Sequence, residues 1–354
     1  MAKIEYISVE EASKLWELSI RSVRNYCTQG RVPGALLEGK TWKIPSNAEK
    51  PSRKTRHIET ENNLLAFLKR EKDSSLKGGI YHKIQIDLTY NSNHIEGSRL
   101  SHDQTRFIFE TKTLGITDDA VKVDDIVETV NHFRCIDLAI EGANTKLSES
   151  FIKQLHYILK TGTTDAMKSW FKVGDYKMIE NVVSDVEDGK TVQWTVLSES
   201  PSSYAAKASV GYIKTVRPED VATEMKALLA DYNSKSEITF DDILDFHVRF
   251  ESIHPFQDGN GRVGRLIMFK ECLKHNIVPF IITEELKMFY YDGLMMAIKS
   301  LANEDVKALS EAGLDASYRG IKEWKNERGY LRDTCLTGQD AMKVSLDYFG
   351  IKYE

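Results

Sequence analysis

Residues 253–265 contain side chains that could act together on a phosphate compound. His254 titrates near neutral pH and can accept a proton from a hydroxyl group. Pro255 follows directly and disfavours helical backbone angles at His254, so we expect the chain to turn there. Asp258 supplies a hard oxygen ligand, the type that Mg²⁺ prefers beside a substrate phosphate. This stretch therefore combines a candidate general base with a candidate metal ligand.

The same stretch continues into a segment that is suited to binding anions. The turn Gly259-Asn260-Gly261 tolerates unusual backbone angles, and successive amides in such a turn can form an anion-binding nest. The apolar run from Val263 to Leu273 predicts a buried helix, whose positive N-terminal end adds to anion affinity. Two arginines three positions apart lie on one side of its first turn and suit phosphate oxygens, namely Arg262 and Arg265. The whole set indicates phosphoryl or nucleotidyl transfer.

The full pattern, His-Pro-Phe-x-Asp-Gly-Asn-Gly-Arg-x-x-Arg, resembles the signature loop of the Fic family (filamentation induced by cAMP) without a mismatch. A bare Gly-Asn-Gly-Arg would also fit a glycine-rich helix entry with a solvated arginine face. Fic proteins mostly transfer AMP from ATP to a hydroxyl side chain of a target protein. The resemblance implies His254 as general base, Asp258 as Mg²⁺ ligand and Phe256 as a core anchor. It implies an α-phosphate cradle of Gly259, Asn260 and Gly261, and β- and γ-phosphate ligands Arg262 and Arg265.

A second motif lies upstream, at residues 92–97. Ser92 and Glu96 are four positions apart and share one face of a helix predicted from Ile80 to about Glu96. A glutamate in the last helical turn is unfavourable with the helix dipole and favours a nearby cation. The segment resembles the inhibitory Ser-x-x-x-Glu-Gly motif of Fic proteins that have an N-terminal inhibitory helix. The resemblance implies that Glu96 inhibits the enzyme, and we expect it to pair with Arg265.

The N-terminal part of the chain differs in charge from the rest. Residues 1–56 hold eleven basic and six acidic side chains, a net charge of +5, whereas the whole chain of 354 residues carries −5. Helices are predicted from Val9 to about Glu17 and from Ile20 to Gln29, followed by a hairpin over residues 36–44. Their predicted inward-facing residues are Ala12, Leu15, Trp16, Ile20, Val23 and Cys27.

Residues 1–50 resemble a winged helix-turn-helix of the MerR/excisionase type, which implies DNA binding. The residues expected to face DNA are Arg21, Arg24, Asn25, Lys40 and Lys43. A winged helix that binds protein and has a solvated basic face fits the same pattern.

The remaining chain is predicted to be mainly α-helical. A basic linker at 51–57 leads into a Fic-type helical bundle over 58–300, and a helical extension follows at 301–354. The inhibitory helix is placed near 80–97 and the active-site loop at 254–265.

One β-hairpin interrupts this helical pattern near residues 178–197. Met178–Val186 and Lys190–Leu197 are β-prone and are joined at Glu187-Asp188-Gly189, which is a hairpin signal. In Fic proteins a hairpin flap at this place in the chain holds the target segment by main-chain pairing. The residues placed at the flap edge are Asn181, Val182 and Val183. An ordinary surface hairpin fits the same pattern.

Composition favours a folded cytoplasmic protein without a membrane span. Hydrophobic residues make up 41% of the chain, enough for a sizeable core, and no apolar run reaches 18 residues. The first residues lack the apolar core of a signal peptide. The four cysteines lie far apart without a Cys-x-x-Cys pair, which favours reduced thiols over disulfides or zinc.

Several functions remain open at this stage. The leading one is Mg²⁺-assisted transfer of AMP from ATP to a Ser, Thr or Tyr hydroxyl of a target protein, which could be the chain itself. The same site could remove AMP, with Glu96 positioning water, or transfer UMP, GMP, phosphate or phosphocholine. A non-enzymatic alternative is a DNA-binding regulator whose Fic domain senses a nucleotide or a partner. The sequence does not specify the target protein or the DNA sequence. It is compatible with a homo-oligomer and does not specify the oligomeric state. The other histidines are expected to be ordinary surface or core residues, namely His82, His94, His132, His156 and His247.

Overall fold

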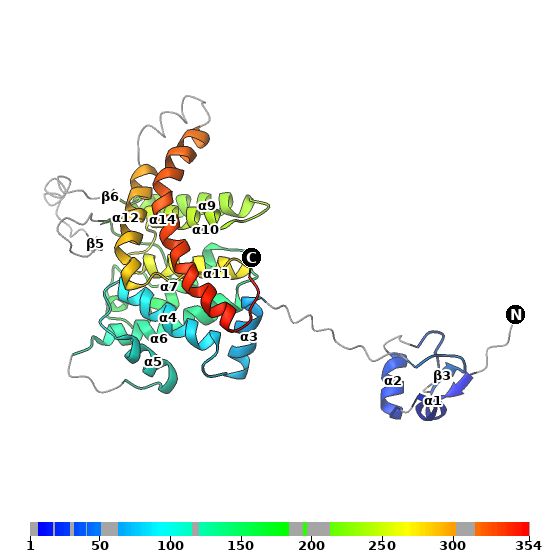
Figure 1. Cartoon of the computed structure of the whole chain (residues 1–354). Coiled ribbons are helices and arrows are strands. Elements are labelled where there is room, and N and C mark those ends of the chain that lie inside the picture. The colour runs from blue at the N-terminus through cyan, green and yellow to red at the C-terminus, as the bar shows by residue number, and fades with distance from the viewer. Residues whose placement is uncertain are drawn as a thin grey trace. The chain divides into compact units, whose positions relative to one another are not determined.

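The computed structural model divides the chain into two compact units, residues 1–61 and 62–354 (Figure 1). The structure is mainly helical, in agreement with the predicted fold class. It describes residues 6–16, 18–28, 32–39, 41–50, 63–114, 120–183, 194–196, 213–301 and 316–353.

The N-terminal unit packs two short helices against a small antiparallel sheet. The helices are α1 (Val9–Trp16) and α2 (Ile20–Thr28). The strands are β1 (Tyr6–Ser8), β2 (Leu36–Glu38) and β3 (Thr41–Pro45), in the order β1-β3-β2. Ser8 begins α1 with a reciprocal cap, because Glu11 N–H donates to Ser8 Oγ and Ser8 N–H donates to the Glu11 carboxylate.

The core of this unit confirms four of the predicted inward-facing residues and corrects two. Its buried residues are Val9, Ala12, Trp16, Val23, Cys27, Val32 and Ile44. Leu15 is 64% exposed and Ile20 is 40% exposed, so both predictions were wrong. Val9, Ala12 and Trp16 recur at three- and four-residue spacing on one face, and Leu15 lies outside that stripe.

Among the residues expected to face DNA, two can be placed with their side chains. Arg24 is exposed and lies 3.8 Å from Glu10, and Lys43 lies on β3. Lys40 and the side chains of Arg21 and Asn25 fall outside the described residues.

The second unit is a helical bundle. Its helices before the second sheet are α3 (Leu64–Ser74), α4 (Ile80–Ile95), α5 (His102–Thr111), α6 (Val123–Glu141) and α7 (Glu149–Lys160). The helices after it are α9 (Pro218–Ser234), α10 (Phe240–Ile253), α11 (Asn260–Lys274), α12 (Glu284–Leu301) and α14 (Ala316–Tyr348). A 3₁₀ turn follows α7 at Asp165–Met167. None of the described helices is both long and apolar enough to cross a membrane.

Helix α11 is the central element of the bundle. Every residue from Asn260 to Leu273 is buried, and the helix packs on α3, α4, α6, α7 and α10 (Figure 1). A helix that is covered on every side has no solvent-exposed face, which agrees with its largely apolar sequence. The functional loop therefore leads directly into the least exposed helix of the unit.

A second antiparallel sheet consists of β4 (Asn181–Val183), β5 (Trp194–Val196) and β6 (Ile213–Lys214). The predicted hairpin pairing of β4 with β5 is present, and the third strand β6 was not predicted. The strand order is β5-β4-β6, so Asn181–Val183 form the middle strand and not the predicted edge. The period-2 pattern of a strand does not indicate which neighbours will pair with it. The rest of the predicted flap, including 184–193, lies outside the described residues.

Candidate functional site

The loop between α10 and α11 has a backbone that its own residues hold in place. His254 ends α10 with φ of +52°, and its N–H donates to the Phe250 carbonyl at 2.9 Å. The Asn260 amide bonds both main-chain groups of Phe256, accepting from its N–H and donating to its carbonyl, each at 2.8 Å. Gly259 has φ of +83°, a region that favours glycine, and the next residue begins α11. Because the Asn260 side chain is engaged, only its main-chain N–H remains to contribute to an anion nest.

His156, on α7, lies directly against this loop. Its ring stacks on Phe256 with centroids 4.0 Å apart and planes 6° apart. The Gly174 N–H donates to Nδ1 at 2.9 Å, so the proton of the neutral ring is on Nε2, which donates to the Asp258 carbonyl at 3.1 Å. His156 was predicted to be an ordinary core histidine. It is buried, and it also supports both Phe256 and Asp258.

The electrostatic surroundings of His254 keep its ring neutral. The residue is 1% exposed. Burial, and next the positive charge of Lys177, hold the pKa of His254 well below its usual value, although Asp258 acts in the opposite direction. The Glu251 carboxyl lies 3.7 Å from His254 Nδ1, and burial together with the nearby Glu96 raises the pKa of Glu251 to about 8. A neutral imidazole is the form that can accept a proton.

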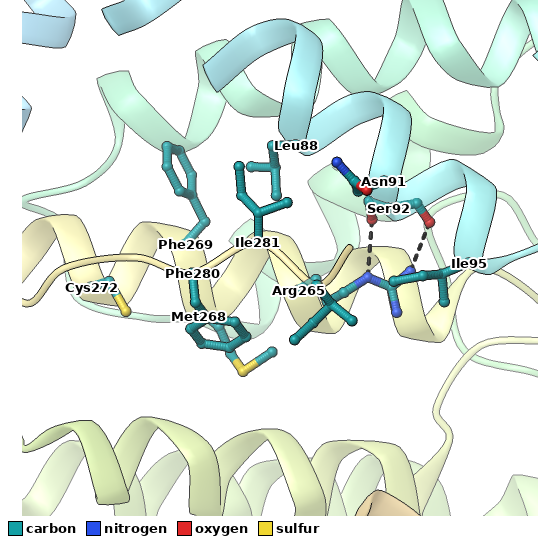
Figure 2. A pocket seen from close by; sticks show the side chains of 11 residues that line it. Leu88, Asn91, Ser92, Ile95, Arg265, Met268, Phe269, Cys272, Phe280 and Ile281 are labelled. Atoms are coloured by element: carbon teal, nitrogen blue, oxygen red, sulfur yellow. Dashed lines mark hydrogen bonds between the residues drawn. The ribbon is translucent and has the colours of Figure 1, made fainter. Parts of the chain in front are cut away.

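Arg265 reaches from α11 to the last turn of α4 (Figure 2). Its Nε donates to Ser92 Oγ at 3.0 Å, and one terminal nitrogen donates to the Ser92 carbonyl at 3.0 Å and to Glu96 Oε1 at 2.6 Å. The two charged side chains are 5% and 12% exposed. The expected contact between these residues is therefore present, although they lie 169 positions apart.

Arg262 points to a different group of charges. It pairs with Glu128 on α6 and, at 3.2 Å, with Asp258. Lys160, at the end of α7, is 2% exposed and pairs with Glu128 at 2.6 Å and with Asp258 at 2.7 Å. Asp165 completes the group at 3.0 Å from Lys160. Both arginines of the loop therefore end on carboxylates of other helices.

The loop lies within a segment that matches a known family. The Fic/DOC family model matches residues 146–272, from just before α7 to near the end of α11. The chain contains a Fic domain. Two relatives with a similar sequence are protein adenylyltransferases by name. Fic-1 of Caenorhabditis elegans is 33% identical over 91 residues, which are 25% of this chain and 18% of that protein. Fic of Aedes aegypti is 25% identical over 215 residues, which are 60% of this chain and 37% of that protein. The chain thus spans well under half the length of either relative.

A solved structure has the same fold. The Fic domain containing signaling protein from Bacteroides thetaiotaomicron superposes with a TM-score of 0.56 at 22% sequence identity. The match covers 82% of this chain and 98% of that one. At this identity the likeness establishes a shared fold and says nothing about substrates.

Within the Fic domain, Asp258 is the residue whose chemistry fits a magnesium ion. Burial opposes its charge, but Lys160 and Arg262 outweigh burial and hold the pKa of Asp258 below its usual range. Its side chain is 36% exposed, so an ionised oxygen ligand is accessible from solvent. Among the described residues, no cluster of three or more His, Cys, Asp or Glu side chains could hold a metal by itself.

Sequence reasoning missed several residues that hold the Fic loop. Lys160 and Glu128 were not singled out, because nothing in their local sequence marks them. Asn181 was singled out for target binding, but its side chain is 2% exposed and donates to the Phe256 carbonyl at 3.1 Å. Lys177 precedes β4 and contacts the loop on both sides of His254.

Proposed function

We propose that the chain is a protein adenylyltransferase, which transfers AMP from ATP to a Ser, Thr or Tyr hydroxyl of a target protein. The observation that carries the proposal is the arrangement of the loop, which begins with a neutral, buried His254 at the end of α10 and ends at the N-terminus of α11. The names of the two relatives support the same reaction class. ATP is therefore the proposed substrate.

In this reaction the acceptor hydroxyl loses its proton to the His254 ring, and its oxygen attacks the α-phosphorus of ATP. The bond from that phosphorus to the bridging oxygen breaks, and pyrophosphate leaves. The first N–H groups of α11 have no acceptor within the helix, and at its positive end they can donate to an anion. Gly259, Asn260 and Gly261 would thus stabilise the charge that develops on the α-phosphate. When bound, Mg²⁺ would be held by Asp258 and the substrate phosphates and would neutralise phosphate charge.

The contact between Glu96 and Arg265 supports a further part of the proposal, namely autoinhibition. A γ-phosphate would need the same guanidinium group that Glu96 now occupies at 2.6 Å, and like charges would repel it from Glu96. ATP could then bind only in a pose whose α-phosphate is misaligned for attack. Glu96 and Ser92 are the inhibitory residues in this proposal.

The proposal is tested by Glu96→Gly with ATP labelled at the α-position and a host lysate as the source of targets. Couplings between sites are typically about 1–3 kcal/mol, so we expect AMP transfer to rise by roughly 5–150-fold. The affinity for ATP should change less. Arg265→Ala is the matched control and should not activate, because it frees Glu96 but removes the γ-phosphate ligand.

The same experiment separates the alternatives. Label that enters protein only from γ-labelled ATP would indicate phosphorylation. No gain in Glu96→Gly would contradict inhibition, and loss of AMP release from a pre-modified substrate in that variant would assign Glu96 to AMP removal. Lack of label from either nucleotide in any variant would favour transfer of another group or a nucleotide-sensing role.

The N-terminal unit suggests a second function, which is binding of DNA. The supporting observations are the net charge of +5 over residues 1–56 and the packing of two short helices against an antiparallel sheet. Arg24 is exposed on α2, the second of these helices. The proposed contacts are made by α2 to base edges and by the β2–β3 hairpin to phosphates.

A further inference from the structure

Lys177 is a buried lysine whose Nζ is surrounded by neutral oxygen atoms. The residue is 3% exposed, and Nζ donates to Asn181 Oδ1 at 2.7 Å, to Thr215 Oγ1 at 2.8 Å and to the Ile253 carbonyl at 3.4 Å. An ammonium group has three N–H donors, so these acceptors match the charged form. Within the described residues no carboxylate forms an ion pair with it, and Glu180 provides only a weaker attraction.

A buried charge without a close counter-ion costs free energy and therefore requires an explanation. Burial lowers the pKa of Lys177 to about 7, and the nearby Glu180 raises it in part. A methionine would fill the same volume without this cost. The reason for a lysine here therefore lies in the three acceptors of its Nζ, because a methionine would keep the main-chain N–H but not these bonds.

The contacts of Lys177 lie on both sides of His254. Its Nζ donates to the carbonyl of Ile253, and its main-chain N–H donates to the carbonyl of Pro255 at 2.9 Å. His254 lies between these two groups with φ of +52°, an unfavourable region for a residue with a side chain. Such a conformation persists only where the surrounding structure holds it.

The same lysine joins this loop to the second sheet. Thr215, next to β6, donates to Asn181 Oδ1 at 2.7 Å and accepts from Lys177 Nζ. Asn181 in turn donates to the Phe256 carbonyl at 3.1 Å. Hydrogen bonds through Lys177 therefore join Asn181 and Thr215 of the sheet region to the backbone from Ile253 to Phe256.

Among the residues that the structure describes, three charged or titratable groups act on the His254 ring. They are Lys177 before β4, Glu251 on α10 and Asp258 on the loop. Lys177 opposes protonation of the ring and Asp258 favours it. The lysine thus acts on both the backbone angle and the charge state of the same residue.

We propose that Lys177 is a positioning residue for His254: its Nζ ties the Ile253 carbonyl, directly before His254, to Asn181 and Thr215, so that the His254 ring faces the acceptor hydroxyl. This inference rests on the proposed function, because a base is required only if a hydroxyl is activated. It assigns no contact between Lys177 and ATP.

The first test is Lys177→Met in the Glu96→Gly protein, with AMP transfer from labelled ATP as the measurement. A small misplacement of a reacting group can cost about 10²-fold, so we expect kcat to fall by up to about 10²-fold. KM for ATP should stay within about twofold, because the proposed phosphate ligands lie elsewhere. Lys177→Arg keeps the charge and the donors and should recover part of kcat.

Lys270→Met is the matched control. Lys270 lies in the second half of α11 and is 0% exposed. Its Nζ donates to the Thr145 carbonyl and to the Glu271 carboxylate. Its loss should lower stability without changing kcat per folded molecule. An equal fall of kcat in both variants would reduce Lys177 to a structural residue and overturn the inference.

A second measurement does not depend on activity. The ring signals of His254, recorded by NMR on histidine-labelled protein without nucleotide, should shift in Lys177→Met and remain in place in Lys270→Met. Unchanged ring signals in Lys177→Met would overturn the inference. If Glu96→Gly transfers no AMP while the ring signals still move, the proposed function fails and the positioning of His254 is supported. If Lys177→Met does not fold, Thr215→Val removes one of the three acceptors, and unchanged ring signals in that variant would likewise overturn the inference.

Discussion

At the scale of single residues, the chemistry of the site depends on the charge state of each side chain, which is set by its burial and its charged neighbours. His254 is neutral because burial and Lys177 both oppose its protonation. Asp258 is only partly buried and remains charged, because the positive charges of Lys160 and Arg262 outweigh the cost of its burial. His254 is thus neutral and Asp258, four positions later in the same loop, is ionised. A neutral imidazole can act as a base and an ionised carboxylate can bind a metal.

Replacement of His254 by alanine tests its role as the base. In the Glu96→Gly protein, His254→Ala should lower AMP transfer by about 10²–10⁴-fold, the usual contribution of a general base. The affinity for ATP should be nearly unchanged, because the proposed phosphate contacts are made by other residues. Transfer and nucleotide binding are measured separately, and thermal unfolding checks the fold. Undiminished transfer would show that another group takes the proton.

At the scale of elements, the close approach of α10 and α11 depends on a small residue. A Cβ atom on Gly264 would lie 2.8 Å from the Glu251 carboxylate and 2.8 Å from the His247 ring. Both of these side chains are buried, and His247 Nε2 is also 2.6 Å from the Tyr290 hydroxyl. Neither neighbour can move toward solvent to make room.

Gly264→Ala should therefore destabilise the Fic domain. Overpacking of a buried site typically costs about 1–3 kcal/mol, and we expect a loss of that size in the free energy of unfolding in urea. The shift of α10 relative to α11 should also lower AMP transfer, because His254 ends the first helix and the anion site begins the second. An unchanged unfolding midpoint would mean that the two helices can separate at little cost.

At the scale of the whole molecule, buried neutral histidines link stability to pH. Burial lowers the pKa of His132, His156 and His247 to about 3 in the folded state, compared with a usual value of 6.5. Below pH 6.5 these histidines therefore bind protons in the unfolded chain but not in the folded chain. The stabilisation is complete above pH 6.5 and is lost as pH falls toward 3.

We accordingly expect the free energy of unfolding to fall steadily between pH 6.5 and pH 4. Each of the three histidines contributes up to about 1.4 kcal/mol per pH unit. Urea unfolding at a series of pH values measures this slope. His247→Gln should reduce the slope by the contribution of one histidine, up to about 1.4 kcal/mol per pH unit. A flat profile over this range would contradict the assignment of these residues as neutral and buried.

The N-terminal unit provides a prediction that is independent of the catalytic site. A fragment of residues 1–56 should bind DNA with an affinity that falls steeply with salt, because bound phosphates release counterions. Lys43→Ala should lower the salt slope by about one if Lys43 contacts a phosphate. Lys14→Ala is the control, since Lys14 is exposed on α1, an element that makes none of the proposed DNA contacts. Absence of any DNA shift at low salt, or binding that ignores salt, would contradict this function.

Local features of the site could be predicted from the sequence alone. Residues 254–265 are contiguous, so their turn, their helix start and the buried apolar helix that follows depend on backbone preferences and periodicity within one segment. The same holds for the helix carrying Ser92 and Glu96, whose last turn was placed within one residue. Side-chain chemistry at short spacing is enough to name candidate residues.

Only the tertiary structure decided which partners these residues have. Arg265 and Glu96 lie 169 positions apart, and Arg262 and Glu128 lie 134 apart, so their pairing depends on how α4 and α6 pack around α11. The roles of Lys160 and Lys177 could not be predicted, because the local sequence does not distinguish a buried lysine from one on the surface. The place of β4 in the middle of its sheet was likewise missed, since the pairing of a strand is a property of its neighbours. Long-range packing chooses partners through shape and burial, and neither can be read from one segment.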